Sequence, residues 1–148
     1  MNASQSGAFA LGLTWLDGHY AVCRFDAHEP MPAWVTNAIA RRSCDGTAAA
    51  RLFSITRTER ELSIVIDESI LPEDIQCKIE RGFAAMRIIG TLDFAMVGVL
   101  AKLTSALAVA NVPVFVISTF DTDYLLVRET DRALATNALE QIARFLPI

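Results

Sequence analysis

Alternating apolar and polar residues predict a chain rich in β-strands. Residues 11–16 and 20–25 alternate in this way, and the Asp17-Gly18 pair between them is a strong turn signal, so a hairpin is expected. Segment 114–118 is apolar on both faces, as expected of a strand in the middle of a sheet. Further strands are predicted at residues 52–56, 62–66, 87–89 and 123–127.

Apolar residues three and four positions apart predict helices. This spacing gives residues 97–110 one apolar face, and Asn111 and Pro113 are expected to end the helix. A weaker helical pattern covers residues 33–42. Proline suits the first turn of a helix, and charged residues of the right sign suit its ends. Two more helices are therefore expected, at residues 72–81 and at residues 131–145, the second with Arg144 in its last turn.

An internal repeat becomes visible when segment 55–65 is laid on segment 117–127. Apolar residues then fall on apolar, hydroxyls on hydroxyls and acids on acids. Two α/β units, each built around a βαββ order, are predicted at residues 11–83 and 84–148. The alternative is a chance similarity between two hairpins.

The order of elements predicts an α+β protein of two tandem ferredoxin-like βαββαβ units, with antiparallel sheets and helices on one face. In such a unit the loop that enters the first helix and the turn between the second and third strands lie at the same end of the sheet. In the second repeat these are residues 91–98 and 118–123. The polar turn is therefore expected beside a helix N-terminus.

A helix N-terminus has unpaired backbone N–H groups and a partial positive charge, so it can bind a carboxylate. Gly98 would allow close approach to the backbone. Each feature also has a structural explanation, because Asp93 can cap the helix and Gly98 can permit close packing.

The turn adds hydroxyls and acids to this site. Ser118, Thr119 and Thr122 offer hydroxyls that could orient a ligand, and Asp121 or Asp123 could meet an ammonium group. A carboxylate with an ammonium group describes an amino acid. The alternative for Asp121 is that its side chain only stabilises the turn.

Segment 92–127, LDFAMVGVLAKLTSALAVANVPVFVISTFDTDYLLV, resembles an ACT domain. Asp93 and Gly98 match the acid and the glycine that open the first helix in that family, and Ser118 matches a hydroxyl on the next strand. Val97 stands where the general motif has proline. Together with the PAWV and FSITRTERELSIV segments, the chain resembles the small bacterial tandem ACT proteins, relatives of the arginine-sensing CASTOR proteins.

This resemblance implies a non-catalytic regulatory module that binds a small ligand, often an amino acid, at an interface between paired ACT units. Asp93 and Asp121 favour a basic amino acid. A homodimer or a regulated protein partner is expected. The candidate ligand-binding residues are Asp93, Phe94, Met96, Val97, Gly98, Val99, Ser118, Thr119, Phe120, Asp121, Thr122 and Asp123.

Composition narrows the class of partner. Among 148 residues, 53% are hydrophobic and the net charge is −4, which argues against nucleic acid and anionic membranes. Polar residues interrupt the most apolar region, 94–118, so no membrane span is expected. The N-terminus lacks the cationic start of a signal peptide. Three widely spaced cysteines, Cys23, Cys44 and Cys77, are typical of a reducing cytoplasm.

Little in the chain suggests catalysis. Neither histidine lies in the predicted site, and no phosphate-binding loop, nucleophile elbow or metal-binding pattern is present. His19 and Cys23 lack the further ligands that a metal ion needs. No metal or other cofactor is therefore expected. The alternative function is a protein-interaction module with the same fold but no ligand.

Overall fold

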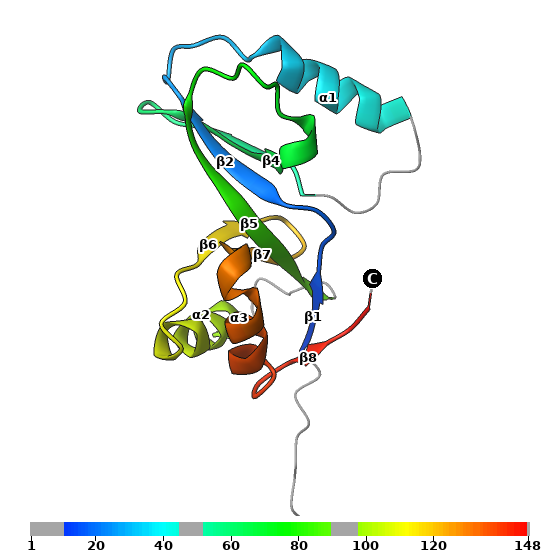
Figure 1. Cartoon of the computed structure of the whole chain (residues 1–148), viewed down its shortest axis with the longest axis vertical. Helices are drawn as coiled ribbons and strands as arrows, with labels where there is room; N and C mark the ends of the chain where they lie inside the picture. The colour runs from blue at the N-terminus through cyan, green and yellow to red at the C-terminus, as the bar shows by residue number, and fades with distance from the viewer. Residues whose placement is uncertain (1–10, 45–51, 90–97, 148) are drawn as a thin grey trace, which may run out of the picture. The chain divides into compact units, whose positions relative to one another are not determined.

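The computed structural model describes residues 11–44, 52–89 and 98–147. The chain forms two compact units (Figure 1). The N-terminal unit comprises Leu16–Ala85, and the C-terminal unit comprises Met1–Trp15 together with Met86–Ile148. Within the described residues, no helix is both long enough and apolar enough to cross a membrane.

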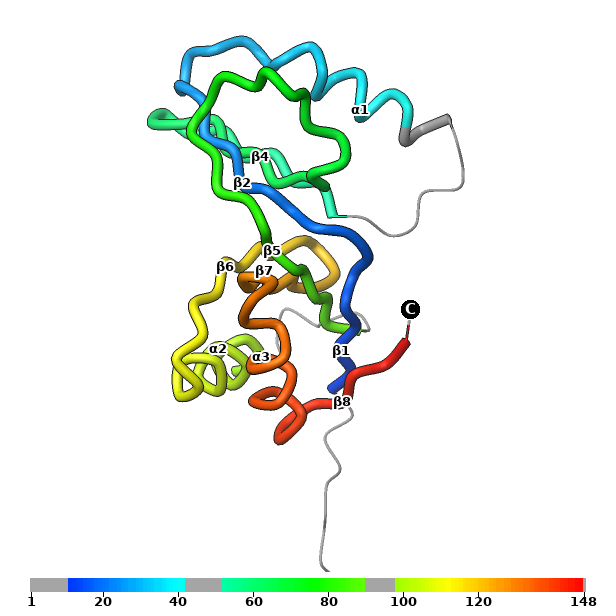
Figure 2. Tube along the Cα trace, viewed as in Figure 1, coloured from blue at the N-terminus to red at the C-terminus, as the bar shows by residue number. Residues whose placement is uncertain are grey.

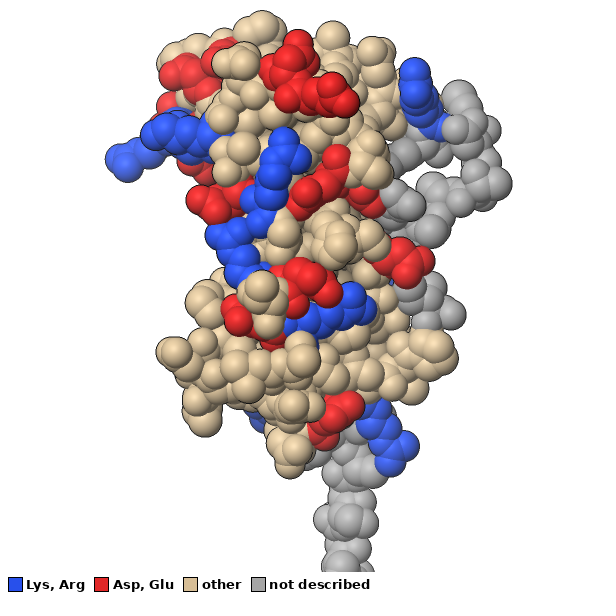
Figure 3. Space-filling model, in the orientation of Figure 1, with Lys and Arg blue, Asp and Glu red and all other residues tan. Residues whose placement is uncertain are grey.

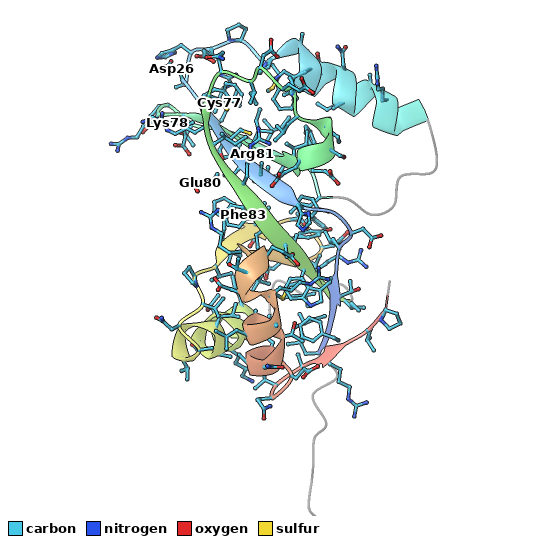
Figure 4. All side chains as sticks on the ribbon, in the orientation of Figure 1. Asp26, Cys77, Lys78, Glu80, Arg81 and Phe83 are labelled. Carbon is cyan, nitrogen blue, oxygen red and sulfur yellow. The ribbon has the colours of Figure 1, made fainter. Side chains whose placement is uncertain are left out.

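The N-terminal unit is an antiparallel sheet with one helix. β4 pairs with both β3 and β2, and β2 pairs in turn with the first part of β5. Figure 4 labels Cys77 just before β5, and Lys78, Glu80, Arg81 and Phe83 along it. The elements of this unit are β2 (Tyr20–Phe25), α1 (Ala33–Cys44), β3 (Ser54–Arg57), β4 (Leu62–Asp67), a short 3-10 turn η1 (Glu68–Ile70) and the start of β5 (Lys78–Ile89).

The core of this unit lies between α1 and one face of the sheet. Val35 and Ala38 of α1 pack with a row of buried side chains from β2 and β4. Residues two apart on a strand face the same side, which explains why alternate positions of β4 are buried together. These sheet residues are Ala21, Cys23, Phe25, Leu62, Ile64 and Ile66.

The C-terminal unit has the βαββα order that the sequence predicts. β6 and β7 form an antiparallel hairpin, and β7 also pairs with β5. β1 pairs antiparallel with Met86–Ile89 of β5 and so supplies the fourth strand. The elements are β1 (Gly12–Trp15), the end of β5, α2 (Val99–Val109), β6 (Phe115–Ser118), β7 (Asp123–Arg128), a 3-10 turn η2 (Glu129–Asp131), α3 (Arg132–Leu139) and β8 (Arg144–Phe145).

Two helices cover the core of the C-terminal unit. α2 and α3 pack against each other (Figure 1). Both bury apolar side chains against the sheet, as the helical spacing predicts. The fully buried members of this core are Leu13, Met86, Ile88, Leu103, Leu107, Leu125, Val127, Ala135 and Leu139.

The predicted hairpin of residues 11–16 with residues 20–25 is wrong. β1 and β2 each pair with β5, and they are not neighbours in the strand order. Gly18 takes the positive φ of 82° that a turn signal suggests, yet the chain does not fold back on itself there. The twelve residues of β5 provide antiparallel partners for both segments. For this reason residues 11–15 belong to the C-terminal unit, whereas the sequence assigned them to a first unit of residues 11–83.

The predicted helix at residues 72–81 is also wrong. Only the 3-10 turn η1 precedes this segment, and β5 begins at Lys78. Residues 78–80 pair with β2, where a strand satisfies the backbone groups of β2 that a helix would leave open. Ile70, Leu71 and Ile75 still pack against the core without forming a helix. Tertiary hydrogen bonding therefore overrides the local helix signal.

The last helix is shorter than predicted. α3 ends at Leu139, and Arg144 lies in β8 rather than in a final helical turn. β8 pairs in parallel with β1, so Arg144 lies opposite Gly12. The predicted helix at 97–110 is confirmed as α2, and the residue expected to end it, Asn111, has a positive φ of 58°.

Segment 114–118 forms a strand, but not a central one. Among the described residues β6 pairs only with β7, and its Phe115 is exposed. Figure 2 follows the reversal of the chain between β6 and β7. The apolar residues on both faces of β6 therefore belong to a sheet edge.

The two hairpins repeat, but their alignment differs by one position from the predicted one. Ser54 lies opposite Val65 in the first hairpin, and Phe115 lies opposite Leu126 in the second. β3, β4 and η1 therefore correspond in their bounds to β6, β7 and η2 when Ser54 is laid on Phe115. The sequence match instead laid residue 55 on residue 117. A shift by one residue exchanges the faces of a strand, so ladder register decides the alignment more strictly than matching acids in a turn.

Candidate functional site

The N-terminus of α2 has an unusual backbone. Gly98 caps the helix with φ of 87° in the left-handed region, and its carbonyl accepts a hydrogen bond from Lys102 N at 3.0 Å. A Cβ added at Gly98 would meet no described heavy atom within 4 Å. Close packing therefore does not explain this glycine within the described residues. The positive φ explains it, and no described residue fills the space at the helix start.

The turn between β6 and β7 is closed by Thr119. Its hydroxyl donates to the Thr122 carbonyl at 2.8 Å, and Thr122 N donates to that hydroxyl at 3.3 Å. The backbone adds a bond from Thr119 N to the Thr122 carbonyl at 2.9 Å. Thr119 thus has the local role that sequence reasoning considered for Asp121, whose side chain is exposed.

Thr122 ties the turn to the end of β5. Its side chain is only 9% exposed, and its hydroxyl donates to the Ile88 carbonyl at 2.8 Å. Segment 90–97 follows β5 directly and leads to Gly98. The turn therefore lies at the end of the sheet from which the chain departs toward α2, as the sequence predicts for this unit.

Several predicted site residues lie at the surface of the turn. Ser118, Phe120 and Asp121 are exposed, and Asp123 is partly exposed opposite Ser118 in the ladder. The ring of Phe120 is 79% exposed, which is high for a large apolar side chain. Val99 packs instead against the core of the C-terminal unit.

Four predicted residues, Asp93, Phe94, Met96 and Val97, lie outside the described residues. The other eight candidates are described. Gly98 lies at the helix start, the six residues 118–123 lie in or beside the turn, and Val99 packs partly into the core. The two threonine hydroxyls already serve the turn and β5. Of the other polar candidates, Ser118 and Asp121 are exposed and Asp123 is partly exposed.

The N-terminal unit repeats the same construction. Thr58 closes the β3–β4 turn with a hydroxyl that accepts from Glu61 N at 3.2 Å, as Thr119 does in the second hairpin. Arg57 donates to the carbonyls of Ala27 and Glu29 in the loop that enters α1. In both units, therefore, residues at the hairpin end bond to the strand end or loop that precedes the helix.

A pocket in the N-terminal unit was not predicted from the sequence. It has a volume of about 390 Å³. Nothing in the local sequence pattern joins Trp34 to the segment before β5. The residues that line it are Phe25, Glu29, Pro30, Pro32, Trp34, Pro72, Asp74, Ile75 and Gln76.

Two observations bear on metal binding and thiol chemistry in the described part of the chain. No three His, Cys, Asp or Glu side chains there are placed to hold a metal ion together. Burial, and then the neighbouring Cys77, raise the pKa of the Cys23 thiol from 9.0 to about 12. Burial also raises the pKa of Cys77. Both thiols stay protonated near neutral pH, which disfavours nucleophilic chemistry.

Comparison with known proteins identifies the fold. The family model of the ACT domain matches residues 78–141. A protein of known structure from Agrobacterium tumefaciens is 31% identical, with a TM-score of 0.76 and coverage of 94% of both chains.

Structures of aspartate kinases share the fold at lower identity. The regulatory subunit of the Thermus thermophilus enzyme is 14% identical, with a TM-score of 0.63, over 90% of this chain and 98% of that one. The aspartate kinase of Clostridium acetobutylicum, an allosteric enzyme, is 14% identical, with a TM-score of 0.64, over 90% of this chain and 34% of that one. The chain therefore contains an ACT domain, matched at residues 78–141, and has the ACT fold.

Proposed function

We propose that this protein is a non-catalytic regulatory module that binds a free amino acid where α2 begins in the C-terminal unit. The observation that carries the proposal is the open, left-handed Gly98 at a helix start, on a unit whose hydroxyl-rich turn is bonded to the preceding strand.

The two ends of an amino acid have suitable partners there. The first N–H groups of α2 have no carbonyl partner within the helix, so they can donate to the α-carboxylate. Asp121 and Asp123 carry the negative charge that an ammonium group needs. These same acids favour a basic side chain on the ligand, as Asp93 does.

The relatives support regulation as the purpose of binding. The fold is shared with the regulatory subunit of an aspartate kinase. We therefore infer that ligand binding changes how this chain pairs, either with a second copy or with a regulated protein, and that the ligand lies at an interface between paired ACT units. The cytoplasm, where free amino acids are abundant, is the proposed location.

One observation favours a second function. β6 is an edge strand among the described residues, and Phe115 and Phe120 are exposed along it and at its turn. An unpaired edge can add a strand from another chain. This geometry suits an interaction module that needs no ligand.

A thermal-shift screen of the full chain against the common amino acids separates the two functions. At a hundredfold excess over its dissociation constant, a ligand adds about 2.7 kcal/mol of stability. For a domain of this size the expected rise in melting temperature is about 3 °C or more. A complete screen at millimolar concentrations without any shift would reject amino-acid binding and leave the interaction module.

A further inference from the structure

We infer that the pocket of the N-terminal unit is a second binding site, which takes a small organic cation with an apolar body, such as an alkyl- or arylammonium ion. Every residue that lines it belongs to Leu16–Ala85. The inference therefore does not depend on the amino-acid site proposed at Gly98.

The walls of the pocket are largely apolar. Phe25 lies almost fully buried at one side, and Trp34, Pro72 and Ile75 are each half-buried. The volume of about 390 Å³ lies in the range of small-molecule pockets. A ligand that fills it must therefore have an apolar body.

The loop that forms one wall is held in place before any ligand binds. Arg57 donates to two of its carbonyls, those of Ala27 and Glu29. The carboxylate of Asp26, labelled in Figure 4, accepts a hydrogen bond from His28 N at 2.9 Å. At its end, the Pro32 carbonyl accepts from Val35 N at 2.9 Å, which begins α1. A preorganised wall lowers the entropy cost of binding.

The facing segment is less regular but has its own bond. Gln76 donates from its side-chain amide to the carbonyl of Asp74 at 3.3 Å. Prolines restrict the backbone at Pro72 here, and at Pro30 and Pro32 across the pocket. Both walls therefore present fixed backbones, and Glu29 and Asp74 are among the residues that line the pocket.

The charge of the lining is entirely negative. Glu29 and Asp74 contribute carboxylates, and neither lysine nor arginine lines the pocket. Within the described residues, no hydrogen bond or salt bridge engages either carboxylate. The nearby Arg57 bonds to backbone carbonyls instead. In Figure 3, acidic side chains gather at the upper end of the view, over the loops that precede α1 and β5.

Trp34 strengthens the preference for a cation. Among aromatic side chains, tryptophan attracts cations to its ring face best, and the attraction grows when the cation leaves water. Two carboxylates, one indole and an apolar wall together match an ammonium group attached to a hydrophobic body. The charged group of an anion of the same shape would instead be repelled by the two carboxylates.

Phenethylammonium is the probe, measured by calorimetry with the full chain. We expect saturable binding at one site, with affinity that falls as salt increases. The comparison ligand is 3-phenylpropionate, which has a similar apolar body and the opposite charge, and it should bind at least about tenfold more weakly. Absence of saturable binding of the cation, or equal affinity for the anion, overturns the inference.

Substitutions place the probe in the pocket. The double variant Glu29→Gln with Asp74→Asn should weaken phenethylammonium binding about tenfold or more, because it removes both charges and keeps their shape. Glu73→Gln is the matched control, since Glu73 is exposed beside Asp74 but does not line the pocket. Equal effects of the double variant and the control would reject the site.

Trp34→Leu should weaken the binding of phenethylammonium. It should have little effect on any binding of 3-phenylpropionate. Should Trp34→Leu fail to fold, the double variant still decides, because both of its positions are exposed. Gly98→Leu should leave phenethylammonium binding unchanged. If a folded Gly98→Leu variant loses phenethylammonium binding, the probe binds at the amino-acid site and the inference is overturned. That result would not reject the proposal that amino acids bind there.

Discussion

The hydroxyl of Thr122 donates to the main-chain carbonyl of Ile88 at 2.8 Å, and this buried bond joins the β6–β7 turn to the end of β5. It places the turn where the chain leaves the sheet toward α2. The same threonine is bonded at its backbone to Thr119. The turn is thus held at two points, and its acids Asp121 and Asp123 project from a fixed frame.

Substitution of Gly98 tests the proposed amino-acid site. Gly98→Leu should abolish amino-acid binding, because the new side chain enters space at the helix start that no described residue fills. Because Gly98 has a positive φ, the leucine side chain should also lower the free energy of unfolding by about 1 kcal/mol.

Gly82→Leu is the matched control for that strain. Gly82 has φ of 79° and open space around its Cβ position within the described residues, but it lies in the N-terminal unit. The Gly82→Leu variant should lose about as much stability as Gly98→Leu, but it should bind the amino acid with unchanged affinity. If calorimetry finds unchanged affinity in a folded Gly98→Leu variant, the ligand binds elsewhere.

Thr119 and Asp121 should differ in their effect on stability. Thr119→Val removes the hydroxyl that closes the turn and should lower the free energy of unfolding by about 0.5–2 kcal/mol. Asp121→Ala changes an exposed residue and should stay within about 0.5 kcal/mol. Urea denaturation midpoints of the two variants, compared with that of the unchanged protein, measure the two stability losses. A larger loss in Asp121→Ala would restore to Asp121 the turn-stabilising role first considered from the sequence.

Asp123→Asn should weaken amino-acid binding while leaving the fold intact. The change removes a charge at the first residue of β7 but preserves the shape of the side chain. A ligand with a cationic side chain should lose more affinity than a neutral one. Calorimetry with both kinds of ligand checks this, and normal binding by Asp123→Asn together with loss in Asp121→Ala would exchange the two roles.

Cys23 should make the N-terminal unit less stable at alkaline pH. Burial raises the pKa of its thiol from 9.0 to about 12, so the folded state holds a proton that the unfolded state releases. Its stabilising contribution is complete below pH 9 and falls as pH rises from 9 toward 12, at no more than about 1.4 kcal/mol per pH unit. Denaturation of Cys23→Ala at several pH values should show a smaller decline. Parallel declines in both proteins would assign the effect to other groups.

Leu13 tests whether β1 belongs to the C-terminal unit. Its side chain is fully buried in the core of that unit, so Leu13→Ala should cost about 2–5 kcal/mol. Hydrogen exchange should then increase first in α2 and β7, which share this core. Increased exchange confined to β2 and β4 would place β1 with the N-terminal unit instead.

The position of the hydroxyl-rich turn in the second unit could be predicted from the sequence, but the role of each hydroxyl in it could not. The hydroxyl-rich turn and the helix start were predicted at one end of the second unit, and the Thr122–Ile88 bond agrees with that arrangement. The roles of Thr119 and Thr122 were not predicted, because a hydroxyl's partner depends on which backbone atom lies within about 3 Å of it. The N-terminal pocket was missed because its walls come from segments far apart in the chain.

The sequence by itself determined most of the periodic elements, the tandem fold class and the end of α2 shortly before Asn111, because apolar spacing and φ preferences are local properties. Only the tertiary structure decided that residues 78–81 form a strand, that β1 pairs with residues 86–89, and that Ser54 corresponds to Phe115 in the repeat. Strand partners and register depend on backbone hydrogen bonds between distant segments. No pattern within one segment specifies which distant edge will accept those bonds.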